Sequence, residues 1–153
     1  MRETVRVTTT IEASAEKVWE MITDLSRMGE WSPEATGGVW IGGAPSVRVG
    51  AKFKGTNKNG SKSWDTTATV ISADRGRLFA FRVAAAGFKV SEWRYEIEPT
   101  ETGCRVTEIW LDERNALVKA LGKPVSGVGH RGPHNRTGME ATLAALKGAA
   151  ESS

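Results

Sequence analysis

The chain carries two histidines, His130 and His134, within the segment HRGPHNRTG. On a continuous helix their spacing would place both imidazoles on one face, as zinc sites require. Pro133 stands between them, and proline is favoured in the first turn of a helix but disruptive inside it. We therefore expect a helix from about residue 133, with Gly132 near its cap, His130 in the preceding loop and His134 in the first turn. No cysteine or nearby aspartate supplies a third ligand, so the sequence predicts no metal site and no cofactor.

A second candidate for chemistry is the carboxylate of Glu108, in the strand-like segment CRVTEIWL. Alternation places Glu108 on one face of this strand with Val106 and Trp110. If that face points inward, Glu108 lies among aromatic side chains and its pKa is raised. If it points outward, Glu108 is an ordinary surface carboxylate. The pattern alone leaves both interpretations open.

No recognised catalytic motif accompanies these residues. The chain has no G-x-S-x-G segment, and its single cysteine, Cys104, opens a predicted strand, where a structural thiol is expected. Acid–base chemistry on a carbonyl compound needs no such motif, only a general acid or base placed near the reacting group. The catalytic residues are therefore unknown, and the candidates for them are Glu108, Tyr95 and His134.

Length and composition indicate one globular domain, residues 1–153, with 39% hydrophobic and 25% charged residues. No apolar run is long enough for a membrane span, and the N-terminal segment MRETVRVTTTIEAS is not of the signal-peptide type, so we expect a cytoplasmic location. The net charge is +3, but most basic residues alternate with acidic ones, and we expect no nucleic-acid partner. The lysines of GAKFKGTNKNGSK are typical of a hairpin with a lysine-protected edge, although contact with an anionic partner stays open.

The pattern of elements predicts an α+β fold. Residues 5–13 form a strand by composition, residues 14–25 a helix capped by Ser14, and Asp24 can cap a second short helix. Six further strands follow between about residues 38 and 112, with an Asn59-Gly60 hairpin turn. An apolar stripe then begins at Met139 in a C-terminal helix. We expect a curved seven-stranded antiparallel sheet wrapped around that long helix, with two short helices after the first strand and a cavity between sheet and helix.

Four stretches in this order resemble a known superfamily: IEASAEKVWEMITDLSRMGEWSPE, GAKFKGTNKNG, WDTTATVISADRGRLFAFRV and HNRTGMEATLAALK. The chain resembles the START-like or SRPBCC helix-grip proteins, and among them the polyketide cyclase/dehydrase-type branch. The resemblance implies a cavity for a lipid-like or aromatic ligand. It brings no matching catalytic motif to this sequence.

The strands and loops carry many aromatic side chains, including six tryptophans, which fill a core or line a ligand cavity. In SEWRYEIE, Trp93, Tyr95 and Ile97 alternate with charged residues and are predicted to face inward. Trp31, in GEWSPE, is expected near the cavity mouth if the resemblance holds. The complete set of predicted ligand-binding residues is Trp31, Phe53, Trp64, Phe79, Phe81, Trp93, Tyr95, Glu108, Trp110, His134, Asn135, Met139 and Leu143.

Three hypotheses about function follow. The first is a noncatalytic binder or carrier of a hydrophobic small molecule that is lipid-, acyl- or polyketide-like, acting as a monomer or weak dimer. The second is a polyketide cyclase/dehydratase-type enzyme that uses the same cavity, and the third is a toxin-like or regulatory interaction protein. The position of Glu108 discriminates between the first two hypotheses. A buried Glu108 carboxylate beside Tyr95 favours the enzyme, whereas an outward-facing Glu108 would remove the best candidate for a catalytic residue.

Overall fold

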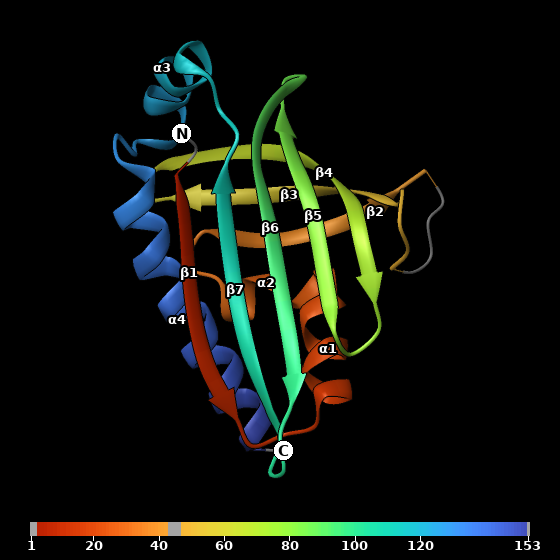
Figure 1. The fold of residues 1–153 in the computed structure, drawn as a ribbon. Coiled ribbons are helices and arrows are strands. Elements are labelled where there is room, and N and C mark those ends of the chain that lie inside the picture. The colour runs from red at the N-terminus through yellow and green to blue at the C-terminus, as the bar shows by residue number, and fades with distance from the viewer. Residues whose placement is uncertain (1–2, 43–46, 153) are drawn as a thin grey trace.

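A computed structural model describes residues 3–42 and 47–152. Within them, seven strands form one antiparallel sheet in the order β1-β7-β6-β5-β4-β3-β2. Figure 1 shows the sheet bending strongly, so that β2, β3 and β4 run across the direction of β1, β7 and β6. The predicted sheet is confirmed. Its strands are β1 (Thr4–Ile11), β2 (Ala35–Ile41), β3 (Lys52–Asn59), β4 (Lys62–Asp74), β5 (Leu78–Ala85), β6 (Phe88–Pro99) and β7 (Cys104–Asp112).

Two short helical segments follow β1, as the caps in the sequence predict. Ser14 accepts a hydrogen bond from the Lys17 amide at 3.1 Å and begins α1 (Ala15–Thr23). Asp24 accepts one from the Ser26 amide at 3.2 Å and begins the 3-10 turn η1 (Leu25–Arg27), which leads into α2 (Met28–Trp31). These segments lie beside β2 and against the concave side of the sheet (Figure 1).

The C-terminal helix α4 (Arg131–Glu151) crosses the concave side of the sheet and packs most closely on β1. It begins at Arg131, two residues before the predicted start, and Gly132, near the cap as predicted, is the second residue of the helix. The reason is that proline is tolerated throughout the first turn, where backbone N–H groups have no intrahelical partner. The placement of His130 outside the helix and of His134 in its first turn is confirmed.

A third helix, α3 (Ala116–Ser126), was not predicted. The segments NALVKALGK and PVSGVGHRG indicate a short apolar piece followed by a glycine-rich loop, because Pro124 and the surrounding glycines argue against a helix. The cap signals were nevertheless present. Asn115 accepts a hydrogen bond from the Val118 amide at 2.9 Å, and Gly127 ends the helix in the left-handed conformation, with φ 74°.

Two details of the sheet also differ from the prediction. The segment LFAFRVAAAGFKV, residues 78–90, reads as one continuous strand in the sequence but is split by a tight turn, in which Ala86 and Gly87 have φ values of 50° and 81°. The lysine-rich strand β3 is not an edge, because β2 pairs with its other side. Alternation in GAKFKG predicts Lys52 and Lys54 on one face and Phe53 on the other, and this is confirmed, since Phe53 is buried while Lys52 and Lys54 are exposed.

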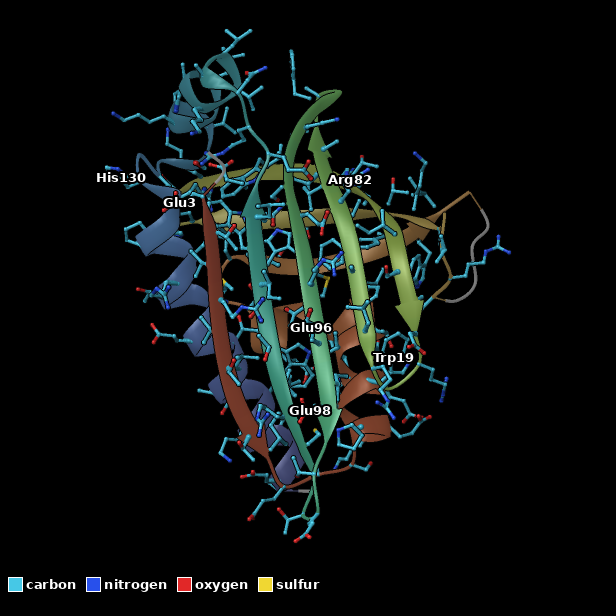
Figure 2. All side chains as sticks on the ribbon, viewed as in Figure 1. Glu3, Trp19, Arg82, Glu96, Glu98 and His130 are labelled. Atoms are coloured by element: carbon cyan, nitrogen blue, oxygen red, sulfur yellow. The ribbon has the colours of Figure 1, made fainter. Side chains whose placement is uncertain are left out.

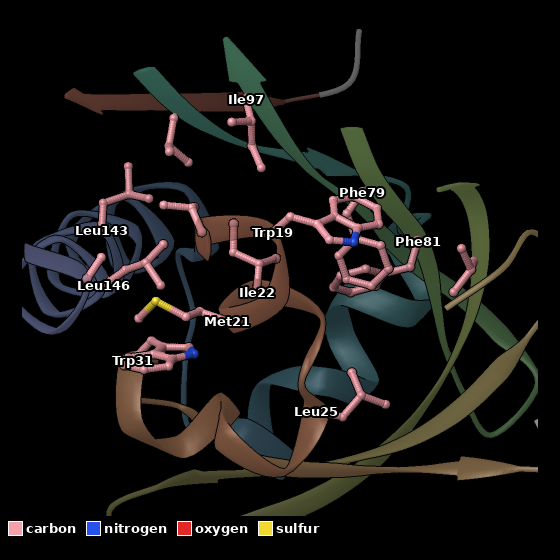
Figure 3. Packing of buried hydrophobic residues seen from close by; sticks show 14 of the residues in the cluster. Trp19, Met21, Ile22, Leu25, Trp31, Phe79, Phe81, Ile97, Leu143 and Leu146 are labelled. Carbon is pink, nitrogen blue, oxygen red and sulfur yellow. The ribbon is translucent and has the colours of Figure 1, made fainter. Parts of the chain in front are cut away.

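The inner side chains form two buried clusters. The larger joins the sheet to α1, α2 and the lower part of α4, and Figure 3 shows Trp31, Phe79 and Leu146 among its members. The smaller consists of Val5, Trp110 and Met139, and half-buried Trp93 packs against both clusters. The opposite face of the sheet is charged, as Figure 2 shows for Arg82, Glu96 and Glu98.

Candidate functional site

An inner cavity of about 30 Å³ lies between the sheet, α1, α2 and α4. It is the size of roughly one water molecule. Its wall is mostly apolar and aromatic, so it can exclude water from any polar group that reaches it. The lining residues are Ile22, Met28, Trp31, Ser32, Phe79, Phe81, Tyr95, Thr142 and Leu146.

Tyr95, a partly buried residue of the cavity wall, is paired with the buried carboxylate of Glu108. The two residues are opposite each other in the β6–β7 register, and the Tyr95 hydroxyl donates a 2.8 Å hydrogen bond to Glu108 Oε2. Glu108 is only 3% exposed, and its Oε1 has no hydrogen-bond partner among residues 3–42 and 47–152. The inward alternative for Glu108 is therefore correct.

Burial raises the pKa of Glu108 to about 8, and the hydrogen bond from Tyr95 offsets only part of this rise. The pKa of Tyr95 is raised well above its usual range by desolvation and by the neighbouring carboxylate. At pH 7 Glu108 is therefore mostly a neutral carboxylic acid. In this form the acid can donate its own proton to the Tyr95 oxygen, which leaves the phenol proton free for an acceptor in the cavity.

Trp31 supplies a second polar atom at the cavity. Its indole Nε1 is buried and makes no hydrogen bond within the described part of the chain, although a buried indole N–H usually has a partner. Figure 3 shows the nitrogen pointing inward, toward the space beside α1. The guanidinium of Arg27 lies 4.7 Å from the centre of the Trp31 ring. The hydroxyl of Tyr95 and the indole N–H of Trp31 are thus two hydrogen-bond donors at one apolar space.

A larger groove of about 620 Å³ lies outside the inner cavity, between α1, η1, β2 and the end of β4. A row of aromatic rings separates the two spaces. Trp19 contacts Phe79 at 6.0 Å, Phe79 contacts Phe81 at 5.3 Å, Phe81 contacts Phe53 at 5.2 Å, and Phe53 contacts Trp40 at 5.6 Å between ring centres. The groove was not predicted. It is lined by Trp19, Glu20, Thr23, Asp24, Leu25, Ser26, Gly38, Val39, Trp40, Val47, Ala73 and Arg75.

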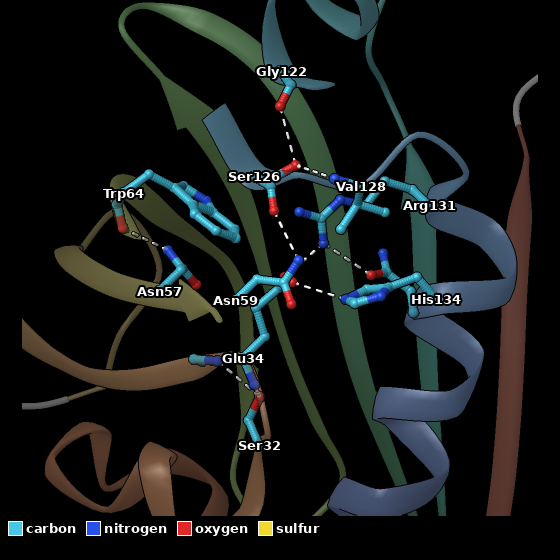
Figure 4. Close-up of polar contacts among 12 residues, drawn as sticks. Ser32, Glu34, Asn57, Asn59, Trp64, Gly122, Ser126, Val128, Arg131 and His134 are labelled. Carbon is cyan, nitrogen blue, oxygen red and sulfur yellow. Dashed lines mark hydrogen bonds and ion pairs between the residues drawn. The ribbon is translucent and has the colours of Figure 1, made fainter. Parts of the chain in front are cut away.

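A polar cluster at the start of α4, here called the Glu34 cluster, consists of Glu34, Arg131, His134 and Asn135. Glu34 Oε1 accepts from Arg131 Nη1 at 2.6 Å, and Glu34 Oε2 lies 3.0 Å from His134 Nε2 (Figure 4). Arg131 also donates to Asn135 at 3.2 Å and lies over the ring of Trp64. The cluster ties the segment before β2 to α4. Sequence reasoning missed Glu34 and Arg131, because no short-range spacing relates residues 97 positions apart.

The predicted ligand-binding residues therefore fall into three groups. Four of them line the inner cavity, with Glu108 directly behind, and three belong to or adjoin the Glu34 cluster. The others pack in the buried clusters, and ligand contact at these positions stays a prediction. The three groups are Trp31, Phe79, Phe81 and Tyr95; then Trp64, His134 and Asn135; then Phe53, Trp93, Trp110, Met139 and Leu143.

The other titratable groups do not assemble a second reactive site in the part of the chain that the structure describes. No three His, Cys, Asp or Glu residues gather there as a metal-binding group. Cys104 is fully buried, and burial raises the pKa of its thiol, which makes it a poor nucleophile. No helix of residues 3–42 and 47–152 is long and apolar enough to cross a membrane.

Comparison with known proteins finds a family and solved structures that match this chain over most of its length. The family described as polyketide cyclase/dehydrase and lipid transport matches residues 2–151. A search of curated proteins gave no match. Among solved structures, the Polyketide_cyc-like protein Cgl2372 from Corynebacterium glutamicum has 29% sequence identity and a TM-score of 0.66, over 96% of this chain and 90% of that protein.

Two more distant structures share the fold. The di-domain ARO/CYC protein StfQ of the steffimycin biosynthetic pathway has 11% identity and a TM-score of 0.75, covering 99% of this chain and 51% of StfQ. The Aha1 dimer from Colwellia psychrerythraea has 16% identity and a TM-score of 0.66, covering 97% and 96% of the two chains. With its curved sheet, its long final helix and a family match over nearly its whole length, this chain belongs to the polyketide cyclase/dehydrase and lipid transport family.

Proposed function

We propose that the chain binds an apolar small molecule that carries a carbonyl or hydroxyl group, in the inner cavity between the sheet and α4. The observation that carries this proposal is the Tyr95–Glu108 pair at the wall of an otherwise apolar space. An apolar ligand fits such a wall, and one oxygen of the ligand would accept from Tyr95 or Trp31. Lipid-, acyl- and polyketide-like molecules have this chemistry. We expect the protein to act as a binder or carrier in the cytoplasm.

Ligand entry requires the cavity to enlarge, since about 30 Å³ holds no such molecule. We infer that it opens into the outer groove. Leu25 lines the groove and Met28 lines the cavity, and both lie against Gly38, where an added Cβ would come within 3.3 Å of Leu25 and 3.4 Å of Met28. Outward movement of η1 and α2 would join the two spaces, whose combined volume is typical of small-molecule sites.

The same pair favours a second candidate function, acid–base catalysis of the cyclase or dehydratase type. Enolisation of a bound carbonyl compound needs a base for the proton on carbon and a donor for the oxygen. A carboxyl group with a pKa of about 8 exists in both protonation states near neutral pH, and Tyr95 links it to the cavity. The toxin-like or regulatory role stays a prediction.

Native mass spectrometry of freshly purified protein tests the binding proposal, because a retained ligand reveals its mass. We expect planar or acyl ligands to quench tryptophan fluorescence and to raise the melting temperature. Tyr95→Phe and Glu108→Gln should weaken binding, whereas Glu98→Gln, on the outer face of β6, should not. A broad lipid and aromatic library that gives neither quenching nor a thermal shift would refute ligand binding.

Turnover distinguishes the two candidate functions. If a bound carbonyl compound exchanges its α-hydrogen for solvent deuterium in the wild type but not in Glu108→Gln, the protein is an enzyme. Binding without exchange supports the carrier.

A further inference from the structure

Helix α3 exposes an apolar stripe that the binding site does not use. Leu117, Leu121 and Val125 are 59%, 53% and 50% exposed, and their spacing of four residues places them on one side of the helix. Only Val118 and Ser126 of α3 are buried. Figure 1 shows α3 projecting beyond the end of the sheet, at the end of the molecule where the tip of the β5–β6 hairpin also lies. An amphipathic helix normally turns such a stripe toward the core, so this one needs another surface.

The charges around the stripe are positive. Lys119 and Lys123 lie on α3 itself, and the helix contains no aspartate or glutamate. Lys62 adjoins the end of the helix, because its Cγ would lie 3.6 Å from a Cβ added at Gly127. The two acidic residues just before α3 are both enclosed and paired. Asp112 is bound to Arg114 at 2.8 Å, with Lys119 3.8 Å away, and Glu113 lies 3.5 Å from Arg82. The exposed surface of α3 therefore carries the apolar stripe on one side and the two lysines on the other.

The β5–β6 hairpin extends this surface. Phe88, the first residue of β6, is exposed, and Lys89 follows it. The segment from Ala84 to Val90 contains no acidic residue. Figure 1 places this hairpin at the same end of the molecule as α3. Two separate elements at this end of the molecule thus carry exposed apolar residues and lysines.

We propose that α3 docks the protein on an anionic lipid bilayer. Leucine, valine and phenylalanine side chains would enter the boundary between headgroups and acyl chains, and the lysines would reach the headgroup phosphates. Each lysine near an anionic membrane adds attraction, which salt weakens. This inference concerns a surface and does not depend on a ligand in the inner cavity.

A second copy of the chain fits this surface less well. In a two-fold dimer through α3, the apolar stripe would meet its own copy, and the contact would be confined to this one helix. One projecting helix of eleven residues, about 16 Å long, also offers far less area than the roughly 800 Å² per partner of a stable interface. A bilayer needs no complementary shape and supplies the opposite charge.

Vesicle co-sedimentation tests the proposal with the full chain. We expect binding to vesicles that mix phosphatidylcholine with phosphatidylglycerol, and at least tenfold weaker binding to phosphatidylcholine alone. Leu121→Glu should weaken binding to the mixed vesicles about tenfold or more. The Lys119→Gln, Lys123→Gln double variant should weaken it by a similar factor and reduce its salt dependence. Val49→Glu is the matched control, because Val49 is also an exposed apolar residue (64%) but lies between β2 and β3.

Two further measurements keep the test decisive. Circular dichroism melting should show that Leu121→Glu is folded. If Leu121→Glu does not fold, the milder variant Leu121→Ala takes its place, and we expect it to weaken vesicle binding by a smaller factor. The proposal is overturned if the mixed vesicles do not bind, or if Val49→Glu weakens binding as much as Leu121→Glu. A stable dimer in light scattering that Leu121→Glu dissociates, with no change in vesicle binding, would also overturn it and assign the stripe to self-association.

Discussion

Two glutamates enclosed by the fold have opposite surroundings. The Glu34 side chain is 23% exposed and contacts the guanidinium of Arg131 and the imidazole of His134. Glu108 is more deeply buried, makes no ion pair within the described residues, and has only the phenol of Tyr95 as a hydrogen-bonding neighbour. A partnered carboxylate can hold elements together, whereas an unpartnered one is kept neutral and ready to exchange a proton. The Glu34 cluster is therefore a structural tie, and the Tyr95–Glu108 pair is the group suited to binding or chemistry.

The largest expected effect is the pH dependence that Glu108 imposes on stability. Its pKa is raised from 4.5 to about 8 in the folded state, so the folded protein binds more protons than the unfolded chain between these values. The contribution of Glu108 to the free energy of unfolding is therefore largest below about pH 4.5. It is lost as the pH rises through about 8, and the total loss is up to roughly 5 kcal/mol. Urea unfolding of wild type and Glu108→Gln from pH 5 to pH 9 measures this.

We expect the wild type to lose stability relative to Glu108→Gln across that range, with Glu98→Gln following the wild type. Parallel curves of stability against pH for wild type and Glu108→Gln would show that the pKa of Glu108 is not raised in the folded protein. Glu108 and Glu34 would then not differ as described.

The second effect comes from the Glu34 cluster. Arg131→Ala leaves Glu34 partly buried without its guanidinium, which should cost about 2 kcal/mol after allowance for partial exposure. Glu34→Gln in the same chain should restore part of the loss, and a double-mutant cycle isolates the coupling between the two side chains. Ligand binding should change far less than in Tyr95→Phe. Additive losses, with no coupling, would argue against a structural tie.

The smallest effect is that of removing one hydroxyl. Tyr95→Phe deletes the hydrogen bond that opposes the rise in the pKa of Glu108, so this pKa should move further upward. The stability cost should be about 1 kcal/mol, as for one hydrogen bond. The midpoint of the pH-dependent stability loss measures the shift. A midpoint that moves downward would mean that Tyr95 does not stabilise the carboxylate form.

Local patterns predicted the sheet, the caps at Ser14 and Asp24, and the inward faces of β6, because alternation and capping depend on neighbouring residues. They could not decide the orientation of Glu108, since both faces of β7 carry apolar side chains. The pairing of β6 with β7, a property of the tertiary fold, places Tyr95 opposite Glu108. The outer groove and the Glu34 cluster depend on contacts between distant segments, which a single sequence does not contain.

The most direct test of the central claim is a titration of the Glu108 carboxyl carbon by NMR, assigned by comparison with Glu108→Gln. The structure predicts a midpoint near pH 8, far above the ordinary value of 4.5 for a glutamate side chain. A midpoint near pH 4.5 would mean that Glu108 is charged at neutral pH. It would contradict the assignment of the Tyr95–Glu108 pair as a neutral, proton-exchanging group at the cavity.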